Sequence, residues 1–119
     1  ENDERVVVPR VFTRYCSSRV LVSQRYEGQS FASITRGGAE ERNAAGETLF
    51  WFVFRSLLTD RVFNADPHPG NYLFLPDRRI VFFDYGCVQE YDAKTQRGLL
   101  AVRDAVLGGV RGQELWDVL

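Results

Sequence analysis

The sequence has almost no lysine. Of its fifteen basic residues, only Lys94 is a lysine, and the other fourteen are arginines. Sixteen acidic residues bring the formal net charge to −1. This balance gives no electrostatic support for nucleic-acid binding as the main task, because such proteins present a basic face to the phosphates.

Long apolar runs are also missing. The longest covers residues 49–54, whereas a membrane span requires roughly 20 residues. Residues 1–4 (ENDE) differ from the basic and then apolar start of a signal peptide. Two cysteines, Cys16 and Cys87, allow at most one disulfide, so free thiols in a reducing compartment are expected. Together these absences favour a cytoplasmic location.

The 119 residues are 45% hydrophobic and 26% charged, as in a soluble globular domain. The residue patterns predict short β-hairpins together with helices, and we expect an α+β fold. A helix that is apolar on all sides is expected to be buried. The expected elements are a hairpin of strands at 6–12 and 20–22, a helical turn or two at 30–38, a helix at 40–59 that is apolar all round over 49–58, an irregular loop at 61–71, a second hairpin at 72–75 and 79–83, a helix from the Asp92 cap to 107 and a short helix from 113.

Three polar side chains flank the second hairpin. Asp66 is followed five residues later by Asn71, and Asp84 follows the hairpin in an Asp-Tyr-Gly sequence. These spacings match the Asp-x-x-x-x-Asn catalytic loop and the Asp-Phe-Gly metal motif of protein kinases. Mg²⁺ prefers oxygen ligands and takes few of them from protein, so Asn71 and Asp84 are the predicted ligands. Asp66 then orients or deprotonates the nucleophile.

The only histidine, His68, lies two residues after Asp66. Many kinases place a lysine at this offset, where it contacts the γ-phosphate. His68 either supplies the same electrostatic contact or holds the loop through hydrogen bonds. The sequence leaves both interpretations open, and His68 is grouped with Asp66 as a candidate catalytic residue.

Residues 65–71 (ADPHPGN) resemble the signature of the UbiB/AarF family of atypical kinases. The hairpin, the sequence Asp84-Tyr85-Gly86 and residues 19–28 agree with this resemblance. It implies a protein-kinase-like fold with a partial N-lobe hairpin, and a C-lobe of helices with a catalytic β-hairpin. It implies ATP and Mg²⁺ as ligands, kinase or ATPase activity, and a link to ubiquinone biosynthesis or membrane-lipid homeostasis.

The same resemblance places the adenine-binding hinge at Gln24, Arg25 and Tyr26. Residues 23–24 are Ser-Gln where the family commonly has Met-Glu, which puts the adenine contacts in doubt. The family's Lys-x-Gly-Gln motif, alanine-rich loop and strand lysine are not found in the sequence. We therefore expect one incomplete kinase-like domain over 1–119, inactive by itself, with an N-lobe hairpin and hinge at 1–28 and a C-lobe core at 29–119.

The expected partners are a nucleotide, lipid- or quinone-pathway proteins, and a second copy that pairs with the unpaired N-lobe strands. A place at the periphery of a membrane follows from the resemblance, and the arginine-rich composition favours a bacterial source. Two alternatives remain. One is a small-molecule kinase similar to aminoglycoside or choline phosphotransferases, whose loop has Gly where this chain has Ala65. The other is a non-catalytic nucleotide-binding fragment.

Overall fold

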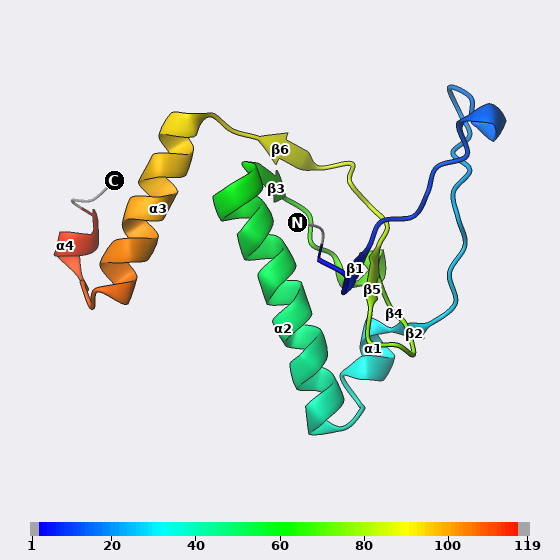
Figure 1. Cartoon of the computed structure of the whole chain (residues 1–119), viewed down its shortest axis with the longest axis horizontal. Helices are drawn as coiled ribbons and strands as arrows, with labels where there is room; N and C mark the ends of the chain where they lie inside the picture. Colours follow the sequence, from blue (N-terminus) through cyan, green and yellow to red (C-terminus); the bar gives the residue numbers. More distant parts are fainter. Residues whose placement is uncertain (1–2, 117–119) are drawn as a thin grey trace. The chain divides into compact units, whose positions relative to one another are not determined.

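The computed structural model describes residues 3–116. The described chain forms two compact units (Figure 1), one of residues 3–52 with 66–86 and the other of residues 53–65 with 87–116. Within the described residues, no helix combines the length and apolar character that crossing a membrane requires.

The first unit is built on a four-stranded sheet in the order β1-β5-β4-β2. Its centre is the predicted second hairpin, formed by β4 (Tyr72–Phe74) and β5 (Ile80–Phe82), which pair antiparallel with Tyr72 opposite Phe82. The turn between them contains Arg78 in the left-handed region, at φ 69°. The prediction of this hairpin is confirmed.

The two edge strands are short and come from the N-terminal third of the chain. β1 (Val6–Val7) runs parallel to β5, and β2 (Gln29–Ser30) runs antiparallel to β4. The prediction of one strand over residues 6–12 was wrong, because the chain divides at Pro9. Proline lacks a backbone N–H and does not continue a ladder.

Beyond Pro9 the chain forms a narrow antiparallel ribbon with a 3₁₀ turn, η1 (Thr13–Tyr15). Isolated bridges join Val11 to Ser23 and Ser17 to Val20. The N-terminal hairpin is therefore present over residues 10–24, although its arms are too irregular to count as strands.

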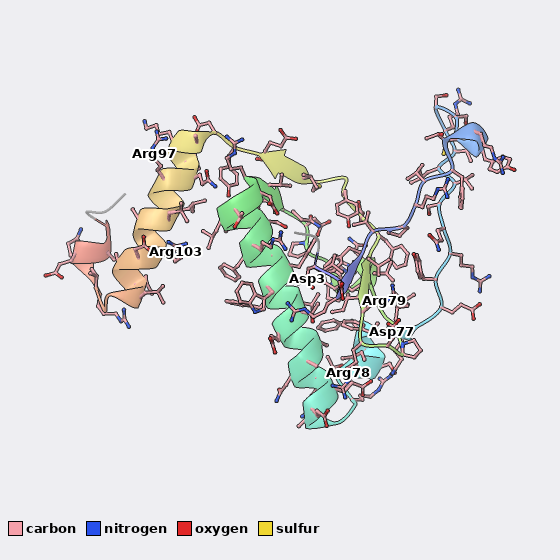
Figure 2. All side chains as sticks on the ribbon, viewed as in Figure 1. Asp3, Asp77, Arg78, Arg79, Arg97 and Arg103 are labelled. Atoms are coloured by element: carbon pink, nitrogen blue, oxygen red, sulfur yellow. The ribbon has the colours of Figure 1, made fainter. Side chains whose placement is uncertain are left out.

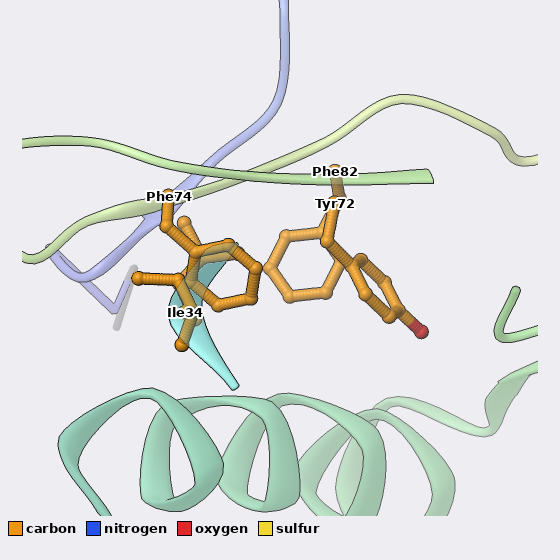
Figure 3. Packing of buried hydrophobic residues seen from close by; sticks show 5 residues of the cluster. Ile34, Tyr72, Phe74 and Phe82 are labelled. Carbon is orange, nitrogen blue, oxygen red and sulfur yellow. The ribbon is translucent and has the colours of Figure 1, made fainter. Parts of the chain in front are cut away.

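The core of the first unit lies between the hairpin and two helices, α1 (Phe31–Ile34) and α2 (Ala39–Arg55) (Figure 3). The rings of Tyr72 and Phe82 meet edge to face with centroids 5.2 Å apart, and Phe52 of α2 lies 4.0 Å from Phe82. Burying an apolar side chain of this size contributes about 1.5–3 kcal/mol. The buried cluster consists of Ile34, Tyr72, Phe74, Ile80 and Phe82.

Only one side of α2 packs on this core. Ala45, Leu49 and Phe52 contact the cluster, whereas Phe50 and Trp51 are 60% and 53% exposed. The expectation of a helix buried all round was therefore wrong. Positions 45, 49 and 52 share one helical face, and nothing among the described residues covers the side chains on the other faces to the same degree.

The second unit contains the end of α2, the π-helical turn η2 (Ser56–Asp60) and a two-stranded sheet. Its strands, β3 (Val62–Asn64) and β6 (Val88–Glu90), are antiparallel. Residues 62–64 were predicted as irregular loop, which was wrong. Only the segment after Ala65 contains the prolines that restrict regular structure, and β3 obtains its partner from a segment more than twenty residues away in sequence.

Helix α3 (Ala93–Leu107) follows β6, and α4 (Gln113–Trp116) ends the described chain. As predicted, the Asp92 side chain caps α3 by accepting a hydrogen bond from the Thr95 N–H over 2.8 Å. Gly108 ends the helix. The expected terminal helix extends to 119, and its last three residues lie outside the described residues.

Candidate functional site

Local hydrogen bonds hold the geometry of the predicted catalytic loop. The loop after Asp66 ends in one 3₁₀ turn, η3 (Pro69–Asn71), with His68 as its N-cap. The His68 Nδ1 accepts a hydrogen bond from the Gly70 N–H over 3.0 Å. The His68 N–H in turn donates to the Asp66 carbonyl over 2.8 Å. Local hydrogen bonds of His68 therefore stabilise both ends of the loop, at Asp66 and at Gly70.

Asn71 is joined directly to the hairpin of β4 and β5. Its carbonyl accepts a hydrogen bond from the Phe83 N–H over 3.0 Å, one step beyond the pair formed by Tyr72 and Phe82. The antiparallel register therefore continues past the named strands. Asp84 comes next after Phe83, so the hairpin brings Asn71 and Asp84 to the same end of β4 and β5.

The Asp84 carboxylate bends the chain that follows it. Its Oδ1 accepts a hydrogen bond from the Gly86 N–H over 2.7 Å, which closes an Asx turn. A Cβ atom at Gly86 would lie 3.1 Å from this oxygen. A side chain at this position would therefore crowd the carboxylate.

The donor set fits a magnesium ion shared with a phosphate ligand. Asp84 is exposed and Asn71 half-buried, and both offer hard oxygen donors. Among residues 3–116, no group of three or more His, Cys, Asp or Glu side chains can hold a metal by itself. Mg²⁺ commonly takes only one or two protein ligands and completes its shell with water and substrate phosphates.

Asp66, the predicted base, is exposed and lies within electrostatic range of Tyr72. Burial is the main cause that raises the pKa of the Tyr72 hydroxyl, and the charge of Asp66 raises it further. Tyr72 is a core residue next to Asn71, so the strand that follows the loop carries a hydroxyl that is influenced by the charge of Asp66. Sequence reasoning did not single out Tyr72, because its position in an apolar run suggested only packing.

The predicted adenine-binding residues lie in the extended segment that leads to β2. The Gln24 N–H donates to the Arg10 carbonyl over 2.8 Å, and the Arg25 side chain pairs with Glu27 over 3.2 Å. Within the described part of the chain, no hydrogen-bond partner is found for the backbone of Arg25 or Tyr26. Of the three predicted residues, Gln24 is thus the one whose backbone N–H already donates within the described part of the chain.

Gly28 fastens this segment to the hairpin. A Cβ atom there would lie 2.4 Å from the Phe74 carbonyl oxygen, so only glycine allows the approach. The segment therefore reaches the sheet at Phe74, which is the end of β4 farther from Asn71. The length of β4, roughly 10 Å for three residues, separates the two groups of predicted site residues along the strand.

The turn end of the hairpin carries ion pairs instead of site residues (Figure 2). Arg79 pairs with Asp77 and Arg78 with Glu40 of α2, each over 2.8 Å. The hydrogen bond from Arg79 is the main cause that lowers the pKa of Asp77. Both pairs are exposed, so they link the turn to its surroundings without adding much stability.

The residues that position the site are more numerous than sequence reasoning predicted. Phe83 fixes Asn71 through its backbone N–H, and Gly70 accommodates the His68 ring, with a hypothetical Cβ at 3.0 Å from Nδ1. The signal for Phe83 was available, because extending the register of the predicted hairpin by one residue places it opposite Asn71. The sequence left open that His68 holds the loop through hydrogen bonds, but it did not indicate Gly70 as the partner.

Comparison with known proteins places these features in a family. Residues 1–109 match the model of the ABC1 atypical kinase-like domain. The chain is 30% identical to an uncharacterized protein of Synechocystis over 87% of its own length, which is 27% of that relative. It is 30% identical to "Probable protein kinase UbiB" of Vibrio cholerae, covering 83% of the chain and 19% of the relative.

Two further similarities extend to a plant protein and to a solved structure. The chain is 35% identical to the chloroplastic protein "ACTIVITY OF BC1 COMPLEX KINASE 3" of Arabidopsis thaliana, covering 71% of the chain and 12% of the relative. The complex structure of Rv3197 with erythromycin, from Mycobacterium tuberculosis, matches with a TM-score of 0.67 and 25% identity, covering 90% of the chain and 28% of that protein. The chain thus spans a minor part of each relative's length.

Proposed function

This chain belongs to the family of ABC1 atypical kinase-like domains, and we propose that it carries the catalytic loop and the metal ligands of an ATP- and Mg²⁺-dependent kinase or ATPase. The observation that supports this proposal best is the hydrogen bond from Phe83 to Asn71. It brings the Asn of the catalytic loop and the Asp of the Asp-Tyr-Gly motif to one end of one hairpin.

Each of the three polar residues then has a separate role. Asn71 and Asp84 hold the Mg²⁺ ion, which neutralises charge on the phosphates. Asp66 accepts the proton of the attacking hydroxyl or water, which typically accelerates such a step by about 10²–10⁴-fold. Its exposed position leaves it accessible to an acceptor molecule.

The nucleotide base is assigned to Arg25 and Tyr26, with Gln24 contributing its side chain or carbonyl. The backbone of Arg25 and Tyr26 has no partner among the described residues, which suits the two hydrogen bonds that adenine makes. The segment joins the sheet at the opposite end of β4 from Asn71. An extended ligand such as a nucleoside triphosphate suits this separation.

The wider biology follows from the family and not from the fold. We propose a role in ubiquinone biosynthesis or membrane-lipid homeostasis, with lipid- or quinone-pathway proteins as partners, at the periphery of a membrane in a bacterium. Support comes from the relative named UbiB, although relatives also occur in chloroplasts. Self-association through the ribbon is supported by its exposed apolar residues, such as Val20 and Leu21.

Binding of a fluorescent ATP analogue to the complete gene product, with and without Mg²⁺, tests the proposal. We expect Asp84→Asn to abolish the Mg²⁺-dependent part of binding, because the substitution removes the charged ligand. Asp77→Asn is the matched control, an exposed aspartate at the other end of the same hairpin. Unchanged Mg²⁺-dependent binding and ATP turnover in Asp84→Asn would refute the assignment, and binding without any turnover would favour the non-catalytic alternative.

A further inference from the structure

The His68 side chain is turned toward its own loop. Its Nδ1 accepts the Gly70 N–H over 3.0 Å, and its carbonyl accepts the Asn71 N–H over 2.9 Å. An imidazole nitrogen that accepts a hydrogen bond carries no proton, so the ring proton of neutral His68 lies on Nε2. The side chain and the carbonyl of His68 thus each accept a hydrogen bond from one of the last two residues of the loop, Gly70 and Asn71.

These contacts leave the backbone of Asn71 fully engaged. Its N–H is held by the His68 carbonyl, and its carbonyl is held by the Phe83 N–H over 3.0 Å. The amide side chain of Asn71 therefore projects from a main chain that is fixed on both sides. We infer that His68 is a positioning residue for the Asn71 ligand, acting through Nδ1 and the turn it caps. This inference rests on the proposed function.

The neighbouring residues keep the ring in place. Pro67 and Pro69 flank His68, and proline restricts both its own φ and the conformation of the residue before it. Pro69 also opens the turn, where its missing N–H costs nothing. At Gly70 a Cβ would lie 3.0 Å from Nδ1 and 3.2 Å from Cε1 of the ring. The absence of a side chain at Gly70 thus permits the close approach of the ring.

This geometry distinguishes the two roles that the sequence left open. A lysine at this position would donate to phosphate, but it has no acceptor and could not cap the turn. The cap requires an acceptor at the place of Nδ1, whereas a phosphate contact would use a donor at the place of Nε2. The side-chain amide of asparagine places a polar atom near the position of Nδ1, and the side-chain amide of glutamine places one near the position of Nε2.

The two amide variants therefore give opposite expectations in the complete gene product. His68→Asn should keep slow hydrogen exchange in the peptide that spans residues 66–71 and should keep the Mg²⁺ requirement for binding the ATP analogue. His68→Gln should speed that exchange and raise the Mg²⁺ concentration at half-saturation by about 10-fold or more, as expected for a residue that supports a metal ligand. Asp92→Ala, which removes the cap of α3, is the matched control and should change neither quantity.

The reverse order, with His68→Gln normal and His68→Asn defective, would overturn the inference in favour of a phosphate contact through Nε2. Unchanged exchange in both variants together with weakened binding in both would also overturn it. If the natural protein binds no Mg²⁺-nucleotide, the proposed function fails by itself. Hydrogen exchange in residues 66–71 then tests by itself whether His68 caps the turn. Slow exchange that persists in His68→Gln would refute the cap.

Discussion

The Phe83 N–H donates to the Asn71 carbonyl over 3.0 Å, one residue beyond the last named pair of the β4–β5 hairpin. This bond joins the end of the predicted catalytic loop to the residue before Asp84. Because both are main-chain groups, their pairing depends on the register of the hairpin and not on the identity of either side chain. The register of the buried β4–β5 hairpin therefore sets the backbone separation between Asn71 and Asp84, the two predicted Mg²⁺ ligands.

Replacing Asp66 should separate turnover from binding. In the complete gene product, Asp66→Ala is expected to lower kcat for ATP turnover by about 10²–10⁴-fold, with little change in the Kd of the nucleotide, because a base acts in the transition state. Steady-state kinetics and equilibrium binding measure the two quantities. Asp77→Ala serves as the control and should change neither. Equal losses in kcat and affinity would show that Asp66 is structural.

Two glycines should respond in opposite directions to alanine. Gly28→Ala places a Cβ 2.4 Å from the Phe74 carbonyl oxygen, and we expect it to lower the free energy of unfolding by about 1–3 kcal/mol. Gly46→Ala, in the interior of α2 with no atom within 4 Å of the added Cβ, should raise it by about 0.5–1 kcal/mol. Urea denaturation measures both. A neutral Gly28→Ala would contradict the close approach to β4.

The start of α3 should loosen in acid. The Thr95 N–H donates to the Asp92 carboxylate, and this hydrogen bond is the main cause that lowers the pKa of Asp92. A lowered folded-state pKa means that the cap stabilises above the unfolded pKa, about 4, and is lost as the pH falls through the folded value. The Thr95 amide resonance should follow this titration. Asp92→Asn caps without a charge, and a persistent acid transition there would contradict the assignment.

Glycine at position 61 should stabilise the second unit. Arg61 ends η2 with φ 59°, and its N–H donates to the Ser56 carbonyl. The left-handed conformation costs an L-residue about 1–2 kcal/mol, while glycine loses about 0.5–1 kcal/mol more entropy on folding. Arg61→Gly should therefore raise the free energy of unfolding by about 0.5–1 kcal/mol. Arg61→Ala removes the same charge but keeps the Cβ, so an equal gain in that variant would refute the explanation.

Local sequence determined the features whose partners are near in the chain. The hairpin of β4 and β5 follows from two apolar runs around a three-residue turn, and α3 from its Asp92 cap and Gly108 stop. The spacing from Asp66 to Asn71 was likewise visible and led to the family that comparison showed. Short-range steric and hydrogen-bonding preferences are sufficient for such features.

Tertiary structure decided the features that depend on a distant partner. β1 pairs with β5 across more than seventy residues, and β3 becomes a strand only because β6 lies beside it. The apolar pattern of α2 likewise did not reveal that Trp51 is exposed, because burial depends on what packs against a face. Sequence alone thus determined the chemistry available around Asp66 and the hairpin that holds Asn71, whereas only the tertiary structure decided which segments pair with β5 and β6, since hydrogen bonds between remote segments leave no local pattern.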